Sequence, residues 1–96
     1  MTHPSETVET KRKRLLFRSK HRGTKEMDIL LGGYYEENMQ SFSEQQLSTF
    51  EGLLNEPDDD LYAWALGREA VPSEIDSDVL RGFIDSVRRR GGGSSL

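Results

Sequence analysis

Hydrophobic residues recur at intervals of three and four along almost the whole chain, and strict alternation of apolar and polar residues is sustained nowhere. The first pattern is typical of amphipathic α-helices, and the second of half-buried strands. The spacing therefore predicts an all-α fold. Because the chain has 96 residues, of which 33% are hydrophobic, it can build only one small core. We predict a small single-domain five-helix bundle with short connections.

The predicted helices are bounded by local start and stop signals. We expect them over residues of about 6–20, 24–39, 43–56, 58–67 and 75–90. Gly32 and Gly33 interrupt the second of these patterns and weaken that helix by about 1 kcal/mol each relative to Ala. The pair indicates a close helix crossing or a bend.

Individual cap residues are also predicted. Ser43 and Gln46 have the spacing of a capping box, which is the clearest helix start in the chain. Asp58 is expected to cap the fourth helix, Thr24 or Gly23 to cap the second, and Gly23 to adopt the left-handed conformation that follows the end of the first. Outside the helical domain, 11–90, we expect a flexible N-terminus, 1–10, and a disordered GGGSSL tail, 91–96.

The composition excludes several kinds of chemistry. The chain has no cysteine, and only His3 and His21 could supply imidazole, so neither disulfides nor a bound metal are expected. No apolar run is long enough to span a membrane, and the N-terminus has no signal-peptide pattern. We expect a soluble protein of a reducing compartment, monomeric when alone and not inserted in a membrane.

Catalytic groupings are equally hard to find. The serines have no plausible histidine base, and His21 lies in a strongly basic helix junction. The acidic run 58–60 lacks the alternating spacing of a calcium loop, so helix capping explains it better. The aromatic residues of the helical patterns are interpreted as core before they are interpreted as a ligand-stacking site. The chain is therefore predicted not to be an enzyme and to bind no cofactor tightly.

Charge is distributed very unevenly. Residues 11–25 hold eight basic residues and no acid, whereas residues 26–85 hold 15 acids and only Arg68 and Arg81 as bases. One interpretation is a basic surface for an anionic partner, for example nucleic acid. The other is a solvated helix face that packs internally against acidic helices. Charge alone does not separate the two.

The junction between the first two predicted helices contains a distinctive group. Arg22 and Glu26 lie four residues apart across a helix start, and Gly23 leaves the backbone open to close approach. One interpretation is a local ion pair with Gly23 serving only as a cap. The other is a protruding recognition corner, in which Arg22 binds a carboxylate or phosphate and Glu26 binds a basic group or a backbone amide.

Two segments resemble the SdhE family of succinate dehydrogenase assembly, or flavinylation, factors. The first is RSKHRGTKEMDILL, residues 18–31, with the Arg-Gly-x-x-Glu motif followed by x-Asp, and the second is FSEQQLSTFEGLLNEPDDDLYAWALG, residues 42–67. The similarity runs from about residue 12 to residue 87. The motif is matched by Arg22, Gly23, Glu26 and Asp28, while His21 stands where many members have another Arg.

This resemblance implies a helical protein that binds the flavoprotein subunit of succinate dehydrogenase, and also that of the related fumarate reductase, and promotes covalent attachment of FAD to the subunit. The FAD would belong to the partner. Arg22, Gly23 and Glu26 would enter the partner near its dicarboxylate site, and Asp28 would stabilise the corner. Arg14, Arg18 and Lys20 would complete the docking face.

The resemblance also implies a location: the cytoplasm in a bacterium, or the mitochondrial matrix in a eukaryote. The alternative function is a nucleic-acid-binding helical module that uses residues 11–25. The acidic remainder of the chain argues against that alternative, because it would repel a polyanion from most directions.

Overall fold

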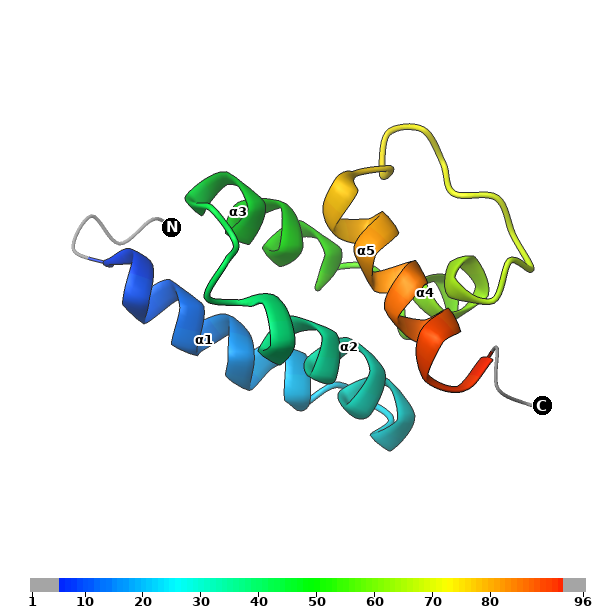
Figure 1. The fold of residues 1–96 in the computed structure, drawn as a ribbon, viewed down its shortest axis with the longest axis horizontal. Helices are drawn as coiled ribbons and strands as arrows, with labels where there is room; N and C mark the ends of the chain where they lie inside the picture. Colours follow the sequence, from blue (N-terminus) through cyan, green and yellow to red (C-terminus); the bar gives the residue numbers. More distant parts are fainter. Residues whose placement is uncertain (1–5, 93–96) are drawn as a thin grey trace.

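Five α-helices form the part of the chain that the structure, a computed structural model, describes: residues 6–92 (Figure 1). They are α1 (Val8–Lys20), α2 (Lys25–Asn38), α3 (Glu44–Leu53), α4 (Asp58–Ala65) and α5 (Asp78–Val87). A π-helical turn, η1 (Arg88–Gly92), continues α5. Residues 6–92 contain no strand, and the all-α prediction is confirmed. The longest connection, residues 66–77, joins α4 to α5.

Hydroxyl side chains begin four of the helices. In each case the residue before the helix accepts a hydrogen bond from the backbone N–H three residues further on, which satisfies one of the otherwise unpaired amides of the first turn. These caps are Thr7, Thr24, Ser43 and Ser77. The predicted capping box is confirmed, because the Gln46 side chain also accepts a hydrogen bond from the Ser43 N–H at 2.9 Å.

Two predicted caps are wrong. Asp58 does not cap α4: Pro57 occupies that position without a side-chain hydrogen bond, and Asp58 is the first helical residue. Gly23 is not left-handed, since Gly67, with φ of 76°, is the only residue with positive φ in the described part. The chain instead leaves α1 through His21, whose N–H donates to the Arg18 carbonyl. Because neither Asp58 nor Gly23 serves as a helix cap, both can make other contacts.

Some element bounds also differ from the predictions. α5 begins at Asp78, because Ser77 caps it, while Ile75 and Asp76 form a separate turn by donating their N–H groups to the Pro72 carbonyl. α1 begins at Val8, inside the segment expected to be a flexible N-terminus. Residues 1–5 and 93–96, which make up much of both expected tails, lie outside the described residues.

One hydrophobic core joins all five helices. Tyr35 of α2 stacks on Phe50 of α3 with ring centroids 4.5 Å apart, and the Tyr34 hydroxyl donates to the Val79 carbonyl of α5 at 2.8 Å. Trp64 is also buried, so the interpretation as core is confirmed for Tyr34, Tyr35 and Trp64, whereas Tyr62 is only partly buried. The fully enclosed side chains include Leu15, Leu31, Leu47, Leu61, Leu80 and Phe83.

Two glycines allow helices to approach closely. A Cβ atom on Gly32 would lie 3.1 Å from the Ser19 carbonyl oxygen, so this glycine permits the close packing of α2 on the end of α1, one of the two roles that the sequence indicated. A Cβ atom on Gly82 would lie 2.5 Å from the Tyr34 hydroxyl oxygen. Small residues at these points therefore fix where α1 and α5 cross α2.

Candidate functional site

The junction between α1 and α2, residues 21–24, forms the end of the α1–α2 pair that lies away from the N-terminus (Figure 1). α1 ends where the His21 N–H bonds to the Arg18 carbonyl, and α2 begins where the Thr24 hydroxyl accepts from the Met27 N–H. Arg22 and Gly23 are left between the two caps. The predicted break between the helices is therefore confirmed, and we call residues 21–24 the corner.

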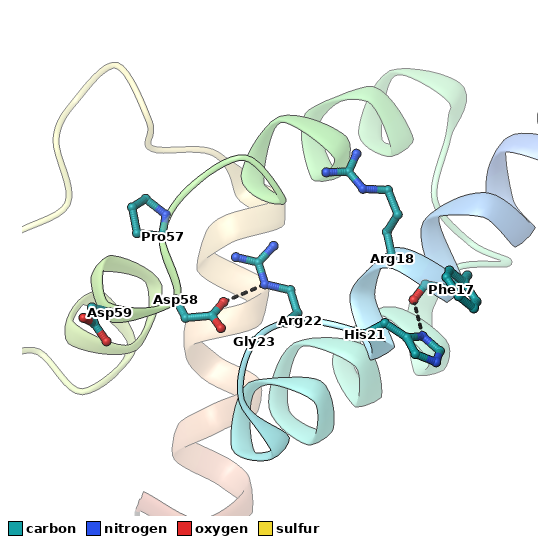
Figure 2. A pocket seen from close by; sticks show the side chains of 8 residues that line it. All are labelled: Phe17, Arg18, His21, Arg22, Gly23, Pro57, Asp58 and Asp59. Carbon is teal, nitrogen blue, oxygen red and sulfur yellow. Dashed lines mark hydrogen bonds and ion pairs between the residues drawn. The ribbon is translucent and has the colours of Figure 1, made fainter.

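The Arg22 side chain points from the corner toward the connection between α3 and α4 (Figure 2). Its Nε donates to Asp58 Oδ1 at 2.6 Å, and its two terminal nitrogens donate to the carbonyls of Leu54 and Glu56, each at 2.7 Å. Only 11% of the side chain is exposed. The guanidinium is thus bound by the chain itself, which differs from the expectation of a protruding arginine.

Asp28 and Glu26 bind separate groups. Asp28 Oδ1 accepts from the Arg22 backbone N–H at 2.5 Å, and this bond supports the predicted role of Asp28 in stabilising the corner. Glu26 Oε2 accepts from the Tyr62 hydroxyl at 3.0 Å, and this bond raises the pKa of Tyr62 above its ordinary value. Arg22 and Glu26 therefore do not form the local ion pair considered above. The Arg22 side chain binds acceptors on residues 54–58, and Glu26 binds the Tyr62 hydroxyl.

These contacts join the two segments on which the family resemblance rests. Arg22 connects the first segment to residues 54–58, and Glu26 connects it to Tyr62 in α4. All of these partners lie in or next to the Glu-Pro-x-Asp-Asp-Leu-Tyr stretch, residues 56–62. The two segments are separate in the sequence. In the fold, these hydrogen bonds hold them together and support the corner.

Gly23 is the open residue of the corner. It is exposed, and among the described residues the only group near the position of a Cβ atom is Asp58 Oδ2, at the ordinary contact distance of 3.8 Å. Its φ is not positive, so its backbone conformation is one that other residues adopt. Neither space nor backbone geometry within the chain requires glycine here. A group from outside can approach the backbone at this point.

An open hollow of about 650 Å³ surrounds the corner (Figure 2). Arg18 lies at its edge, exposed and without a hydrogen bond or ion pair to its guanidinium in the described residues. Asp59 lies on the opposite side, on α4. The lining residues are Phe17, Arg18, His21, Arg22, Gly23, Pro57, Asp58 and Asp59. The hollow therefore offers an available cation, Arg18, next to the open backbone of Gly23.

Phe17 is a surface feature that the sequence interpretation missed. Its side chain is 64% exposed and stacks on the His21 ring with centroids 4.0 Å apart, while His21 Nδ1 lies 2.7 Å from the Phe17 carbonyl oxygen. The helical spacing contains the necessary signal. Leu15 and Ser19, four residues apart, are buried, so Phe17 at the midpoint lies on the opposite face of α1. The exposed ring adds an apolar surface beside the corner.

Most of the basic segment is occupied by contacts within the chain. Arg14 binds Glu6 and Glu51, each at 2.7 Å, and these bonds hold the pKa of Arg14 above its ordinary value. Arg12 donates to two backbone carbonyls, and Lys20 pairs with Glu36. The structure therefore favours the interpretation of internal packing for much of this segment. It leaves Arg14 and Lys20 less available for docking than Arg18.

Within residues 6–92, no three His, Cys, Asp or Glu side chains are grouped so that they could hold a metal ion. None of the helices described has the length and apolar character needed to cross a lipid bilayer. The fold and the corner together define a small all-helical protein in which the junction between α1 and α2 is held from inside by Arg22 and Asp58 and borders an open hollow.

Comparisons with known proteins identify the family. A family model described as "flavinator of succinate dehydrogenase" (Sdh5) matches residues 13–86. The chain is 39% identical to "FAD assembly factor SdhE" of Acetobacter pasteurianus over 88 residues, covering 92% of this chain and 81% of that protein. It therefore belongs to the family of succinate dehydrogenase flavinators.

Other relatives are eukaryotic. The chain is 40% identical over 74 residues to "Succinate dehydrogenase assembly factor 2, mitochondrial" of Dictyostelium discoideum, covering 77% of this chain and 52% of that protein. A protein with the same name from Caenorhabditis elegans is 34% identical over 91 residues, covering 88% of this chain and 76% of that protein. The chain thus spans about half the length of the first of these two relatives.

Proposed function

We propose that this protein is an assembly factor that binds the flavoprotein subunit of succinate dehydrogenase and promotes covalent attachment of FAD to it. The observation that carries the proposal is the family match over residues 13–86, which includes the whole corner and its internal support. Relatives named as FAD and succinate dehydrogenase assembly factors support it. The related flavoprotein subunit of fumarate reductase is a second partner of the same class.

The protein would act by positioning and not as an enzyme. The hollow at the corner is open to solvent, and the donors of Arg22 that line it are bound to the chain itself, so the hollow does not fit FAD as a tight site. FAD would remain in the partner, where its own chemistry forms the bond. Docking at the corner would hold the subunit in an arrangement that aligns the flavin with its attachment residue, and such alignment lowers the barrier to reaction.

Three features in or beside the corner suit a protein partner. Gly23 allows a backbone to approach, the exposed Arg18 can bind a carboxylate, and the exposed Phe17 ring offers apolar contact area. The protein would bind as a monomer. Its location would be the compartment where the flavoprotein subunit matures, the cytoplasm of a bacterium or the mitochondrial matrix of a eukaryote.

Covalent flavin fluorescence tests this function. The flavoprotein subunit from cells lacking the protein is run on a denaturing gel, which removes FAD that is not covalently bound. We expect the fluorescent band to be strongly reduced and to be restored by the wild-type gene. A Gly23→Arg gene should fail to restore it, whereas Gly52→Arg, the same change at an exposed helical glycine with nothing near its Cβ position, should succeed. Unchanged fluorescence in the deletion strain would refute the proposal.

A further inference from the structure

Asp58 connects two parts of the molecule that are far apart in sequence. It is the first residue of α4, where the positive end of the helix dipole favours a carboxylate, and only 18% of its side chain is exposed. Its Oδ1 accepts from Arg22 Nε at 2.6 Å, and its Oδ2 is the nearest group to the Cβ position of Gly23. One carboxylate therefore binds Arg22 and lies beside the position that a Cβ atom on Gly23 would occupy.

Arg22 is held inward by more than this ion pair. Its three side-chain nitrogens each donate to a different acceptor on residues 54–58, and its backbone N–H donates to Asp28. A charged group with this many short bonds and little exposure is costly to release, because each broken bond must be replaced. The side chain is thus arranged to support the corner from within.

We propose that Asp58 is a positioning residue for docking of the flavoprotein subunit, and that it acts through Arg22. Asp58 fixes the Arg22 side chain against α4, and the fixed Arg22 backbone presents the adjacent Gly23 to the partner. Arg22 faces the chain's own α3–α4 connection in the complex as it does in the free protein. This inference rests on the proposed function, and it assigns a role to a residue outside the Arg-Gly-x-x-Glu motif.

The test compares Asp58→Asn with Asp60→Asn. Both changes remove one carboxylate from the first turn of α4, but Asp60 does not line the hollow and has no side-chain hydrogen bond or ion pair in the described residues. The measurement is the Kd for the purified flavoprotein subunit, at a temperature well below the Tm of each variant. We expect Asp58→Asn to weaken binding by about tenfold or more and Asp60→Asn to leave it unchanged.

Two further variants separate positioning from loss of stability. Gly82→Ala should lower Tm by crowding Tyr34 in the core, yet keep the wild-type Kd, because Gly82 lies in α5 away from the corner. In an Arg22→Ala background, Asp58→Asn should produce no additional weakening, since the two residues act as one unit. The inference would be overturned if Gly82→Ala weakened binding as much as Asp58→Asn does. It would also be overturned if the effects of Arg22→Ala and Asp58→Asn on binding were fully additive.

A measurement on the wild-type chain avoids dependence on the folding of variants. The Nε–H resonance of Arg22 should keep its chemical shift when the unlabelled flavoprotein subunit is added, because Asp58 remains its acceptor. A large change in that shift, or wild-type affinity in Asp58→Asn together with lost affinity in Arg22→Ala, would show that Arg22 contacts the partner directly. Failure of the wild-type chain to bind the subunit at all would instead refute the proposed function, and this inference with it.

Discussion

Gly23 is the residue at which a functional role and a structural role separate most cleanly. Because its Cβ position is open and its φ is not positive, Gly23→Arg should leave the Tm within a few degrees of the wild-type value. The added side chain would occupy the space through which a partner backbone approaches, so binding of the flavoprotein subunit should be lost. Circular dichroism measures the Tm of the variant, and a binding isotherm measures its affinity for the flavoprotein subunit. An unfolded Gly23→Arg protein would contradict this assignment.

Arg22 leads to the opposite prediction for stability. Its guanidinium makes three short bonds to residues 54–58, at the connection between α3 and α4. Removing them should lower the free energy of unfolding by about 2 kcal/mol. Arg18→Ala, at an exposed arginine beside it, should change that free energy by less than about 0.5 kcal/mol. Urea unfolding that gives equal values for both variants would contradict this account.

The motif residues can be found from the sequence, but their partners cannot. The spacing of Arg22, Gly23 and Glu26 marks the corner, since it depends only on neighbours in the chain. The acceptors of the Arg22 side chain lie more than thirty residues away, at Leu54, Glu56 and Asp58. A long-range contact of this kind depends on how the helices pack, and the acidic run at the start of α4 is explained equally well by the helix dipole alone.

At the scale of the helices, two glycines in similar sequence settings predict opposite effects of the same change. Gly82→Ala in α5 should lower the free energy of unfolding by about 1–3 kcal/mol, because the new methyl group would overlap the Tyr34 hydroxyl. Gly52→Ala in α3 should raise it by about 0.5–1 kcal/mol, because nothing lies near its Cβ position and Ala favours the helix. Thermal unfolding of the pair checks this, and stabilisation by Gly82→Ala would show that α5 does not cross α2 as described.

Helix starts with a local chemical signal are predicted well, and those set by tertiary contacts are not. The Ser43 and Gln46 capping box and the Thr24 cap are formed by neighbouring residues, and both are confirmed. The start of α4 is different, because Pro57 occupies the cap position and Asp58, the first helical residue, binds the distant Arg22. A long-range contact of this kind is invisible to a pattern based on spacing.

Across the whole molecule, the basic segment is balanced largely by the chain itself. Five of its eight cations have acidic or carbonyl acceptors, or both, within the fold: Lys11, Arg12, Arg14, Lys20 and Arg22. We therefore expect no retardation of a short DNA or RNA duplex in a gel-shift assay at low salt. Binding that weakens steeply as salt is added would instead revive the nucleic-acid alternative.

Two buried tyrosines of the hydrophobic core predict how the stability of the fold changes at high pH. Burial raises the pKa of Tyr34 and of Tyr35 from 10.0 to about 12. Because the folded state disfavours the ionised form, their contribution to stability is complete below pH 10 and is lost as the pH rises toward 12. In a Tyr62→Phe background, tyrosinate absorbance should appear together with loss of helical circular dichroism. Ionisation near pH 10 with the helices intact would contradict this prediction.

The most direct test of the central claim is a reconstituted flavin attachment reaction. The purified flavoprotein subunit without covalent flavin is incubated with FAD, and mass spectrometry measures the fraction that acquires one covalently bound FAD. We predict that the wild-type protein raises the rate of attachment, that Gly52→Arg does so equally, and that Gly23→Arg does not. A rate that is the same with and without the wild-type protein would contradict the claim that this chain promotes flavin attachment through its corner.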